Sequence, residues 1–149
     1  MVLKKPNMVN VFILDEYNHA LLIHNIKNNS DRWEFPGGKV EKIFEPKSRL
    51  RLESAAIKEA KEELDIYVAF PYPPNQHIFG DYETQTPEGD FLCRTFFATI
   101  LYGTPKIMES KKHDKFGYFS YKEILKLNKT GTLVPNLKLA LPKLEEYIK

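Results

Sequence analysis

Residues 37–65 read GGKVEKIFEPKSRLRLESAAIKEAKEELD and contain the pattern that decides the fold. The second half of this stretch is rich in Ala, Glu, Lys and Leu, which predicts a helix over residues 52–64. A helix turns by about 100° per residue, so Glu59, Glu62 and Glu63 share an arc of roughly 100°. One short helix therefore crowds three carboxylates together after a Pro-Gly-Gly turn.

The predicted helix also has an apolar side that can pack on a sheet. That side consists of Ile57, Ala60 and Leu64. Above the acidic arc, Ala55 and Ala56 have small side chains that allow another backbone segment to come close. We expect this segment to be the turn at residues 36–38, because its glycines permit unusual dihedral angles and close approach.

Two explanations account for the crowded glutamates. Hard divalent cations take oxygen ligands, and Mg²⁺ is commonly held by one or two carboxylates together with substrate phosphates and water. Alternatively, the helix is exposed, and its glutamates form weak pairs with Lys58 and Lys61, worth a few tenths of a kcal/mol each. The helix taken alone is compatible with both explanations.

The other segments alternate between strands and helices without an internal repeat. Strands are predicted at residues 8–14, 20–26, 33–35, 66–70, 77–84, 91–101 and 117–120, and further helical segments at 122–127 and 136–148. The first two strands are expected to form a hairpin through the turn DEYNH. Because the order lacks a regular βαβ period, it indicates an α+β fold with a mixed sheet and about three helices.

Composition limits the classes of protein to which the chain belongs. Its 149 residues are 42% hydrophobic, which favours a single domain over residues 1–149. The net charge of +2 does not indicate a strongly basic nucleic-acid-binding surface, so no stable nucleic-acid complex is expected. Cys93 is the sole cysteine, which excludes a disulfide framework and makes a cytoplasmic location the expectation. The apolar run near the N-terminus is too short to span a membrane.

The opening stretch resembles the Nudix box, whose pattern is G-x5-E-x7-R-E-U-x-E-E-x-G-U, with U an aliphatic residue. The matching positions are Gly38, Glu59, Glu62, Glu63 and Ile66. The run WEFPGGKVE is similar to the strand and turn that precede the box in many members of that family. Chain length and element order also suit a Nudix domain, and the resemblance implies an α/β/α sandwich with a mixed sheet.

Three positions depart from the family pattern. Lys58 replaces the usual Arg and lacks its bidentate guanidinium fork. Asp65 replaces a Gly, which is tolerable because Asp is among the residues that adopt the left-handed conformation after a helix. Leu50 stands where the first glutamate of the box is expected, and the loop after the glycines is longer than usual. Glu45 and Glu53 are the two candidates to supply the displaced carboxylate.

The resemblance implies a metal-dependent hydrolase. In the family reaction, water attacks a phosphorus of a nucleoside diphosphate linked to another moiety, and Mg²⁺ or Mn²⁺ is required. By this resemblance the metal ligands are Glu59 and Glu63, completed by Glu62 and by the carbonyl of Gly38. Such cations neutralise pyrophosphate charge and lower the pKa of a bound water. The general base is either a box glutamate, Glu62 or Glu63, or Glu109 in the later segment KIMESKKHDKF.

Substrate-binding candidates are basic and aromatic side chains outside the helix. Phosphate contacts are expected from Arg32, Lys39 and Arg94, and base stacking from Trp33, Phe35, Tyr82 or Tyr118, each of which is also a candidate core residue. Asp114 lies four residues before Tyr118, where related nucleotide-pool enzymes place base-reading acids. His113 is expected at the surface, since no second His lies at metal-ligand spacing.

The expected substrates are small nucleotides, with nucleoside triphosphates of the MutT kind ahead of ADP-ribose. Many ADP-ribose hydrolases build their site across a dimer with an extra N-terminal sheet, and the strand predicted at residues 8–14 leaves no room for one. Dinucleoside polyphosphates are an alternative, because Tyr72, Tyr82 and Tyr118 offer stacking surfaces for a second base. A non-catalytic nucleotide-binding module is another, although such a module would be free to lose the acid triad. Monomer and homodimer both stay open.

Overall fold

The computed structural model describes residues 5–40, 51–71, 77–87 and 89–149. The strands are β1 (Met8–Ile13), β2 (Ala20–Asn25), β3 (Arg32–Glu34), β4 (Gly37–Lys39), β5 (Tyr67–Ala69), β6 (Ile78–Thr86), β7 (Gly89–Tyr102) and β8 (His113–Phe119). The helices are α1 (Arg51–Leu64), α2 (Tyr121–Lys129) and α3 (Pro135–Leu144), with a short 3-10 helix, η1 (Lys27–Asn29). The α+β class and the helix predicted at residues 52–64 are confirmed.

The strands form two sheets. The larger sheet has the order β4-β1-β7-β5, with β6 paired to β7 beside this path, and the smaller sheet has the order β3-β2-β8. Strands β1 and β7 run parallel, whereas β4, β5 and β6 pair antiparallel with their neighbours. The larger sheet is therefore mixed, as the sequence predicts.

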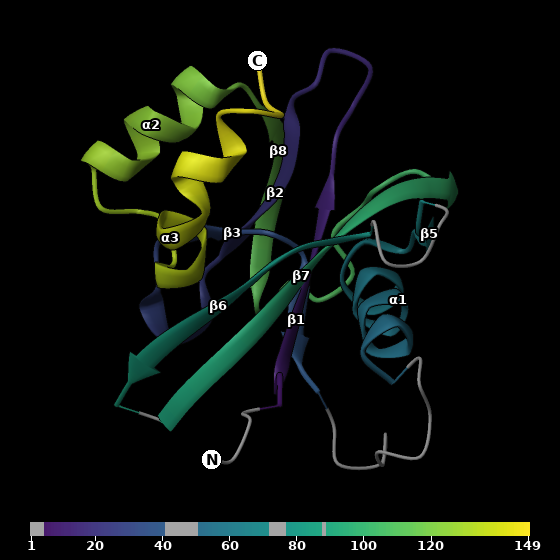
Figure 1. Cartoon of the computed structure of the whole chain (residues 1–149), viewed down its shortest axis with the longest axis horizontal. Helices are drawn as coiled ribbons and strands as arrows, with labels where there is room; N and C mark the ends of the chain where they lie inside the picture. The colour runs from purple at the N-terminus through teal and green to yellow at the C-terminus, as the bar shows by residue number, and fades with distance from the viewer. Residues whose placement is uncertain (1–4, 41–50, 72–76, 88) are drawn as a thin grey trace.

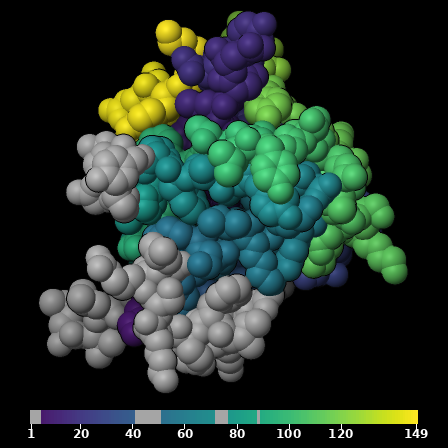
Figure 2. Space-filling model, turned by 90° about the vertical axis from the view of Figure 1, so that its right-hand side faces the viewer, coloured from purple at the N-terminus to yellow at the C-terminus, as the bar shows by residue number. Residues whose placement is uncertain are grey.

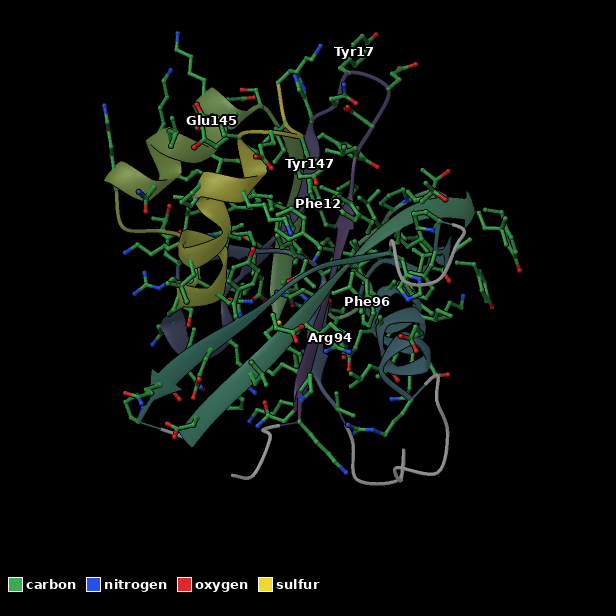
Figure 3. The ribbon with its side chains drawn as sticks, viewed as in Figure 1. Phe12, Tyr17, Arg94, Phe96, Glu145 and Tyr147 are labelled. Atoms are coloured by element: carbon green, nitrogen blue, oxygen red, sulfur yellow. The ribbon has the colours of Figure 1, made fainter. Side chains whose placement is uncertain are left out.

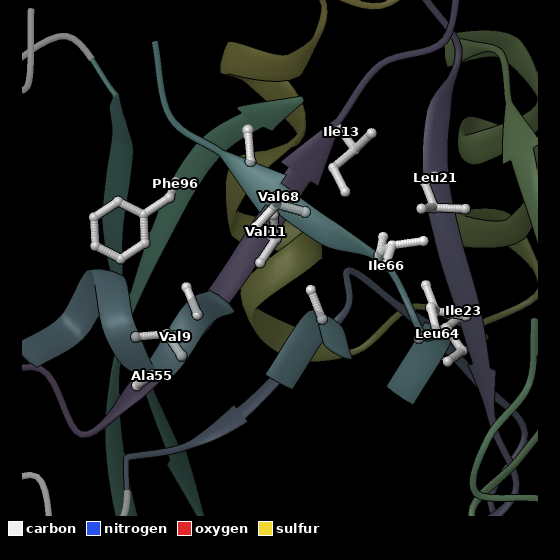
Figure 4. Close-up of a cluster of buried hydrophobic side chains, with 13 residues drawn as sticks. Val9, Val11, Ile13, Leu21, Ile23, Ala55, Leu64, Ile66, Val68 and Phe96 are labelled. Atoms are coloured by element: carbon white, nitrogen blue, oxygen red, sulfur yellow. The ribbon is translucent and has the colours of Figure 1, made fainter. Parts of the chain in front are cut away.

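Helices cover the strands from two sides. Figure 1 shows α1 on one side of the strands and α2 and α3 on the other. Strand side chains point alternately to opposite faces, so Val9 and Val11 of β1 lie in the core under α1, while Phe12 lies in the core under α3. The core under α1 is drawn in Figure 4. Together these layers form the α/β/α sandwich that positions the site.

The second core is rich in aromatic rings. The ring of Phe12 lies 5.3 Å from that of Phe35 and 5.2 Å from that of Phe79, measured between centroids. Tyr147, which follows α3, reaches the same cluster with its ring centroid 6.3 Å from that of Phe12 (Figure 3). Within the described segments, every helix is too short or too polar to cross a membrane.

The expected hairpin between the first two strands is wrong. Strand β1 pairs with β4 and β7, and β2 pairs with β3 and β8, so the two strands belong to different sheets. They are joined across the turn by an isolated bridge between Leu14 and Ala20 and by a hydrogen bond from the N–H of Asp15 to the carbonyl of His19. Both strands are buried along almost their whole length, and each is an inner strand of its own sheet with partners on both edges.

Two other segments differ from expectation. The turn predicted at residues 36–38 is wrong for its two glycines, which belong to strand β4 (Gly37–Lys39), with Gly38 opposite Val9 and Gly37 opposite Asn10. The final strand begins at His113 rather than at Gly117, because β8 continues its pairing with β2 as far as Asn25 after a register shift. Residues 113–119 are therefore strand and not loop.

Candidate active site

The two glycines of β4 allow this strand to lie between β1 and α1. A Cβ atom at Gly37 would overlap the carbonyl oxygen of Val9 in β1. A Cβ atom at Gly38 would lie 2.8 Å from the carboxylate of Glu59 in α1. The close approach expected between the Gly-Gly segment and the acidic face of the helix is confirmed, and it brings a carboxylate against backbone.

Glu63 is the buried centre of the acidic face. Glu63 is only 5% exposed, and its Oε1 accepts a hydrogen bond of 2.8 Å from the backbone N–H of Gly37. Burial raises the pKa of Glu63 well above its ordinary value, and the negative charges of Glu34, Glu59 and Glu109 raise it further against the opposing hydrogen bond from Gly37. The ionised form of this carboxylate is therefore unfavourable unless a positive charge binds beside it.

The segment before β8 brings two more side chains to Glu63. The backbone N–H of Met108 donates to the carbonyl of Glu63 at 3.2 Å, which fixes this segment at the end of α1. Figure 2 shows α1 in blue at the surface beside the green residues that follow β7. Glu109 is half-buried, and His113 at the start of β8 is 2% exposed. The Nε2 atom of His113 lies 3.4 Å from Oε2 of Glu63, so the expectation of a surface histidine is wrong.

These side chains open into a cavity of about 390 Å³. Its lining includes the five carboxylates of Glu34, Glu59, Glu62, Glu63 and Glu109, together with Gly37, Gly38, Lys27, Lys39, Lys112 and His113. Two of the acids are paired with lysines: Glu62 lies 2.7 Å from Lys58, and Glu109 lies 3.3 Å from Lys112. Of the helical ion pairs considered for the sequence, the pair of Lys58 with Glu62 is confirmed, whereas Lys61 pairs with Asp65.

The donor set fits a divalent cation. The ligand atoms of Glu63, Glu109 and His113 all lie within 4.8 Å of one another. The unfavourable charge on buried Glu63 is relieved if a cation binds there, and oxygen-rich sites of this kind suit hard divalent ions. Gly38, Glu59 and Glu62 line the same cavity.

A second cavity, of about 400 Å³, adjoins the first. The two share Met8, Asn25, Glu34 and Lys39, so they lie side by side and together make up the cleft. The second cavity is also lined by Arg32, Ser30, Thr84, Thr86, Pro87, Phe91, Val134 and Asn136. It therefore lies between β3, the hairpin of β6 and β7, and the start of α3.

Of the eight expected substrate-binding residues, Arg32 and Lys39 line this cleft, and the other six line neither cavity: Trp33, Phe35, Tyr82, Arg94, Asp114 and Tyr118. Arg32 and Lys39 line the second cavity. Phe35 is 2% exposed in the aromatic core, and Tyr82 packs against that core. Arg94 projects from β7 (Figure 3), and its guanidinium donates to both carboxylate oxygens of Asp81 at 2.8 Å. Asp114 lies 2.6 Å from Nδ1 of His24, whose Nε2 lies 2.6 Å from Asp31.

The structure describes one of the two candidates for the displaced box glutamate, Glu53, but not the other, Glu45. Glu53 lies on α1 with its Oε1 3.4 Å from Nε2 of His77, and it does not line either cavity. Glu45 lies outside the described residues. Asp65 adopts a φ of 56°, which confirms the left-handed conformation expected after the helix.

Sequence reasoning missed several residues of the cleft, including Asn25, Glu34, His113 and Asn136. For Glu34 a signal was present. Trp33 and Phe35 are buried on one face of the chain, so the residue between them points to the other face. Asn136 carries no comparable local signal, because it reaches the cleft only through the packing of α3 against the sheet.

Comparisons with known proteins agree with this geometry. A family model described as the NUDIX domain matches residues 4–139. The fold is similar to that of a MutT NUDIX hydrolase from Burkholderia pseudomallei, with 20% identity, 93% of this chain and 98% of that chain covered, and a TM-score of 0.72. A MutT protein from Methanosarcina mazei Go1 shares 22% identity over 97% of each chain, with a TM-score of 0.70.

An Ap4A hydrolase from C. elegans also has a similar fold, with 14% identity over 93% of each chain and a TM-score of 0.65. A comparison with curated protein sequences gave no match. At these identities the solved structures establish the fold, whereas the family match covers most of the sequence and includes the glycines and glutamates of the cleft. The chain belongs to the NUDIX family and is a Nudix hydrolase, an enzyme that acts on substrates linked through a nucleoside diphosphate.

Proposed function

We propose that this enzyme hydrolyses nucleoside triphosphates to a nucleoside monophosphate and pyrophosphate, with Mg²⁺ or Mn²⁺ as cofactor. The observation that supports the proposal best is the cleft in which an acidic cavity of about 390 Å³ lies beside a second cavity of about 400 Å³ and shares four lining residues with it. Each is within the size range of small-molecule sites. The acidic part suits a phosphate chain with its cation, and the adjoining part suits one nucleoside.

The ligands of the cation would be Glu59 and Glu63, with Glu62, Glu109 and the carbonyl of Gly38 as further oxygen donors. A divalent cation, when bound, supplies charge neutralisation at the phosphates and a lower pKa for a coordinated water. The hydrogen bond from Gly37 fixes the orientation of the Glu63 carboxylate before substrate arrives. Lys39 lies where the two cavities meet, so its ammonium group can pair with a phosphate while the nucleoside occupies the second cavity.

The general base is Glu62 or Glu109 in this proposal. Glu63 is not suited to the role, because it is buried, one of its oxygens accepts from Gly37 and the other faces His113. The side chains of Glu62 and Glu109 are 45% and 33% exposed, and water can reach both. We expect Glu62→Gln and Glu109→Gln to differ in the pH profile of kcat, because only loss of the base removes the acidic limb of that profile.

The residues around the second cavity give the nucleoside polar and apolar partners. Arg32 and Asn136 offer side-chain donors, and Phe91 offers a ring that lies under the ammonium group of Lys39, 5.3 Å from its centroid. These partners replace the aromatic and acidic residues expected from the sequence, since Phe35, Tyr82 and Asp114 lie elsewhere.

The alternative substrates are ADP-ribose and dinucleoside polyphosphates. A second base would need a further stacking surface, and Tyr82 and Tyr118 pack instead against the two hydrophobic cores. Tyr72, the third residue considered for that role, lies outside the described residues. A triphosphate with a single base therefore fits the described cleft best.

The test is a comparison of kcat/KM across a substrate panel with added Mg²⁺ or Mn²⁺. The panel contains canonical and oxidised nucleoside triphosphates, ADP-ribose, NADH, sugar nucleotides and diadenosine polyphosphates. At least one triphosphate should give the highest value and release pyrophosphate. If ADP-ribose or a dinucleoside polyphosphate is preferred by about tenfold, which is about 1.4 kcal/mol in transition-state binding, the proposed substrate is wrong and the family assignment stands. Binding without turnover across the whole panel would instead identify a nucleotide-binding module.

A further inference from the structure

His113 is a buried ring whose nitrogens are poorly satisfied by the protein. It is 2% exposed, and its Nδ1 has no hydrogen-bond partner among the described residues. Its Nε2 lies 3.4 Å from Glu63 and 3.7 Å from Glu34, and both separations exceed the usual N–H···O length of about 2.7–3.2 Å. A buried imidazole in such a position is short of partners in the protein itself.

The Nε2 atom of His113, and not its unpartnered Nδ1, faces the place where three side chains converge. The ligand atoms of His113, Glu63 and Glu109 lie within 4.8 Å of one another. Two donors bound to one ion at about 2.1 Å each are separated by at most about 4.2 Å, so small side-chain rotations are enough for a single ion to bridge all three. The cluster thus has the size of one coordination sphere.

The backbone fixes the histidine and the later glutamate relative to each other. The N–H of His113 donates to the carbonyl of Glu109 at 3.0 Å, and the N–H of Lys112 donates to the same carbonyl at 2.9 Å. Because Glu109 and His113 are four residues apart in this single turn, their side chains lie on the same side of it. The bond from Met108 to the carbonyl of Glu63 then joins the turn to α1. The three donors are therefore held by α1, one tight turn and the first residue of β8.

Imidazole changes the metal preference of a carboxylate site. Mg²⁺ takes oxygen ligands and keeps several waters, whereas imidazole nitrogen suits later divalent ions of the first transition row. We propose that His113 coordinates a first-row transition metal ion together with Glu63 and Glu109, so that the cleft binds Mn²⁺ in preference to Mg²⁺. This inference extends the proposed metal-dependent function by naming a nitrogen ligand for its cation.

The chain contains a matched control for this role. His77 is also buried, at 6% exposure, and its Nε2 also lies 3.4 Å from a glutamate, Glu53. It lies outside both cavities. The variants His113→Asn and His77→Asn therefore remove the same kind of buried His and Glu contact, one at the cleft and one away from it.

The experiment uses Mn²⁺ alone, without nucleotide. Binding is titrated through the electron paramagnetic resonance signal of free Mn²⁺, and the bound ion is probed for nitrogen coupling by electron spin echo envelope modulation. The wild type and His77→Asn should show coupling to nitrogen, and His113→Asn should lose it. We expect His113→Asn to weaken Mn²⁺ binding by at least about tenfold and Mg²⁺ binding, measured by competition, by much less.

Uniform labelling of histidine with ¹⁵N gives a second readout on the wild-type protein and does not depend on folding of a variant. The label should replace the ¹⁴N modulation of bound Mn²⁺ with a ¹⁵N signal. Absence of nitrogen coupling in the wild type, its persistence in His113→Asn, or an equal loss of Mn²⁺ and Mg²⁺ binding would overturn the proposal and leave His113 as a charge partner of Glu63. None of these measurements depends on which nucleotide is hydrolysed, so failure of the substrate proposal is seen separately.

Discussion

At the residue scale, the proposed metal site centres on Glu63. Its carboxylate is buried, is hydrogen-bonded to the backbone of Gly37 and lies among other acids. In the absence of metal such an arrangement opposes folding when the group is charged. The carboxylate proposed as a metal ligand is therefore expected to reduce stability, as is common at functional sites.

Glu63→Gln should keep the fold and lower kcat/KM by at least about a hundredfold, because loss of a carboxylate ligand removes about 2.7 kcal/mol or more of transition-state stabilisation. The measurement is metal-dependent hydrolysis of the best substrate in the panel. Glu146→Gln, at an exposed position after α3, is the control for a general charge effect and should leave the rate unchanged. Near-normal turnover in Glu63→Gln would contradict the role given to this carboxylate.

The raised pKa of Glu63 leads us to expect that the stability of the protein depends on pH. Because the folded-state pKa of Glu63 is raised above its value in the unfolded chain, the wild type without metal loses stability as pH rises above the ordinary glutamate value of about 4.3. The variant Glu63→Gln, which has no ionisable group at this position, should not lose stability in this way as the pH rises. In urea unfolding with a chelator, the variant should be at least as stable as the wild type at pH 7, and the difference should shrink toward pH 5. A variant that is less stable at pH 7 would show that the charged form is favoured in the fold.

At the element scale, β4 and α1 depend on each other, and the two glycines of β4 have separable effects. Gly37→Ala should lower the free energy of unfolding by at least about 2 kcal/mol, because the added methyl group meets the backbone of β1. Gly38→Ala should cost less, since the atoms that it meets belong to the movable carboxylate of Glu59, but it should weaken metal binding. Chemical unfolding and Mn²⁺ titration of both variants measure the contrast. Equal effects on stability would contradict this division.

The displaced box glutamate gives a second test at this scale. Glu53→Ala should lower the free energy of unfolding by about 1 kcal/mol, because it removes the partner of buried His77. The same change should leave metal binding unchanged. Glu45→Ala should weaken metal-dependent activity if Glu45 replaces the displaced carboxylate. Negligible effects of both changes on activity would mean that the long loop has lost that function, and a larger loss of activity at Glu53 would reverse the choice.

How far the sequence predicts each element depends on how local its signals are. The acidic helix, its apolar face and the left-handed Asp65 follow from residue spacing within one element, and they are confirmed. The separation of β1 and β2 into two sheets depends on distant partners, β7 and β8, which local turn residues do not encode. His113 was missed for the same reason: its partner Glu63 lies 50 residues away in the sequence, on another element.

At the scale of the whole molecule, the sandwich brings residues from both sheets, from α1 and from α3 to one cleft. Strand β4 and helix α1 supply the glycines and glutamates, the turn before β8 supplies Glu109, and β3 and α3 border the second cavity. The family implies the reaction class, and in the proposed function the walls of the second cavity select the nucleotide. Those walls come from distant parts of the chain, so the substrate follows less directly from the sequence than the metal site does.

The most direct measurement of the central claim is product identification. The purified protein is incubated with an equimolar mixture of nucleoside triphosphates, ADP-ribose and diadenosine tetraphosphate in the presence of Mn²⁺ or Mg²⁺, and the products are separated by anion exchange. The account predicts early release of pyrophosphate and a nucleoside monophosphate from a triphosphate, no reaction with chelator, and at least about a hundredfold slower release by Glu63→Gln. Metal-independent hydrolysis, or release of orthophosphate and a nucleoside diphosphate as the first products, would contradict it.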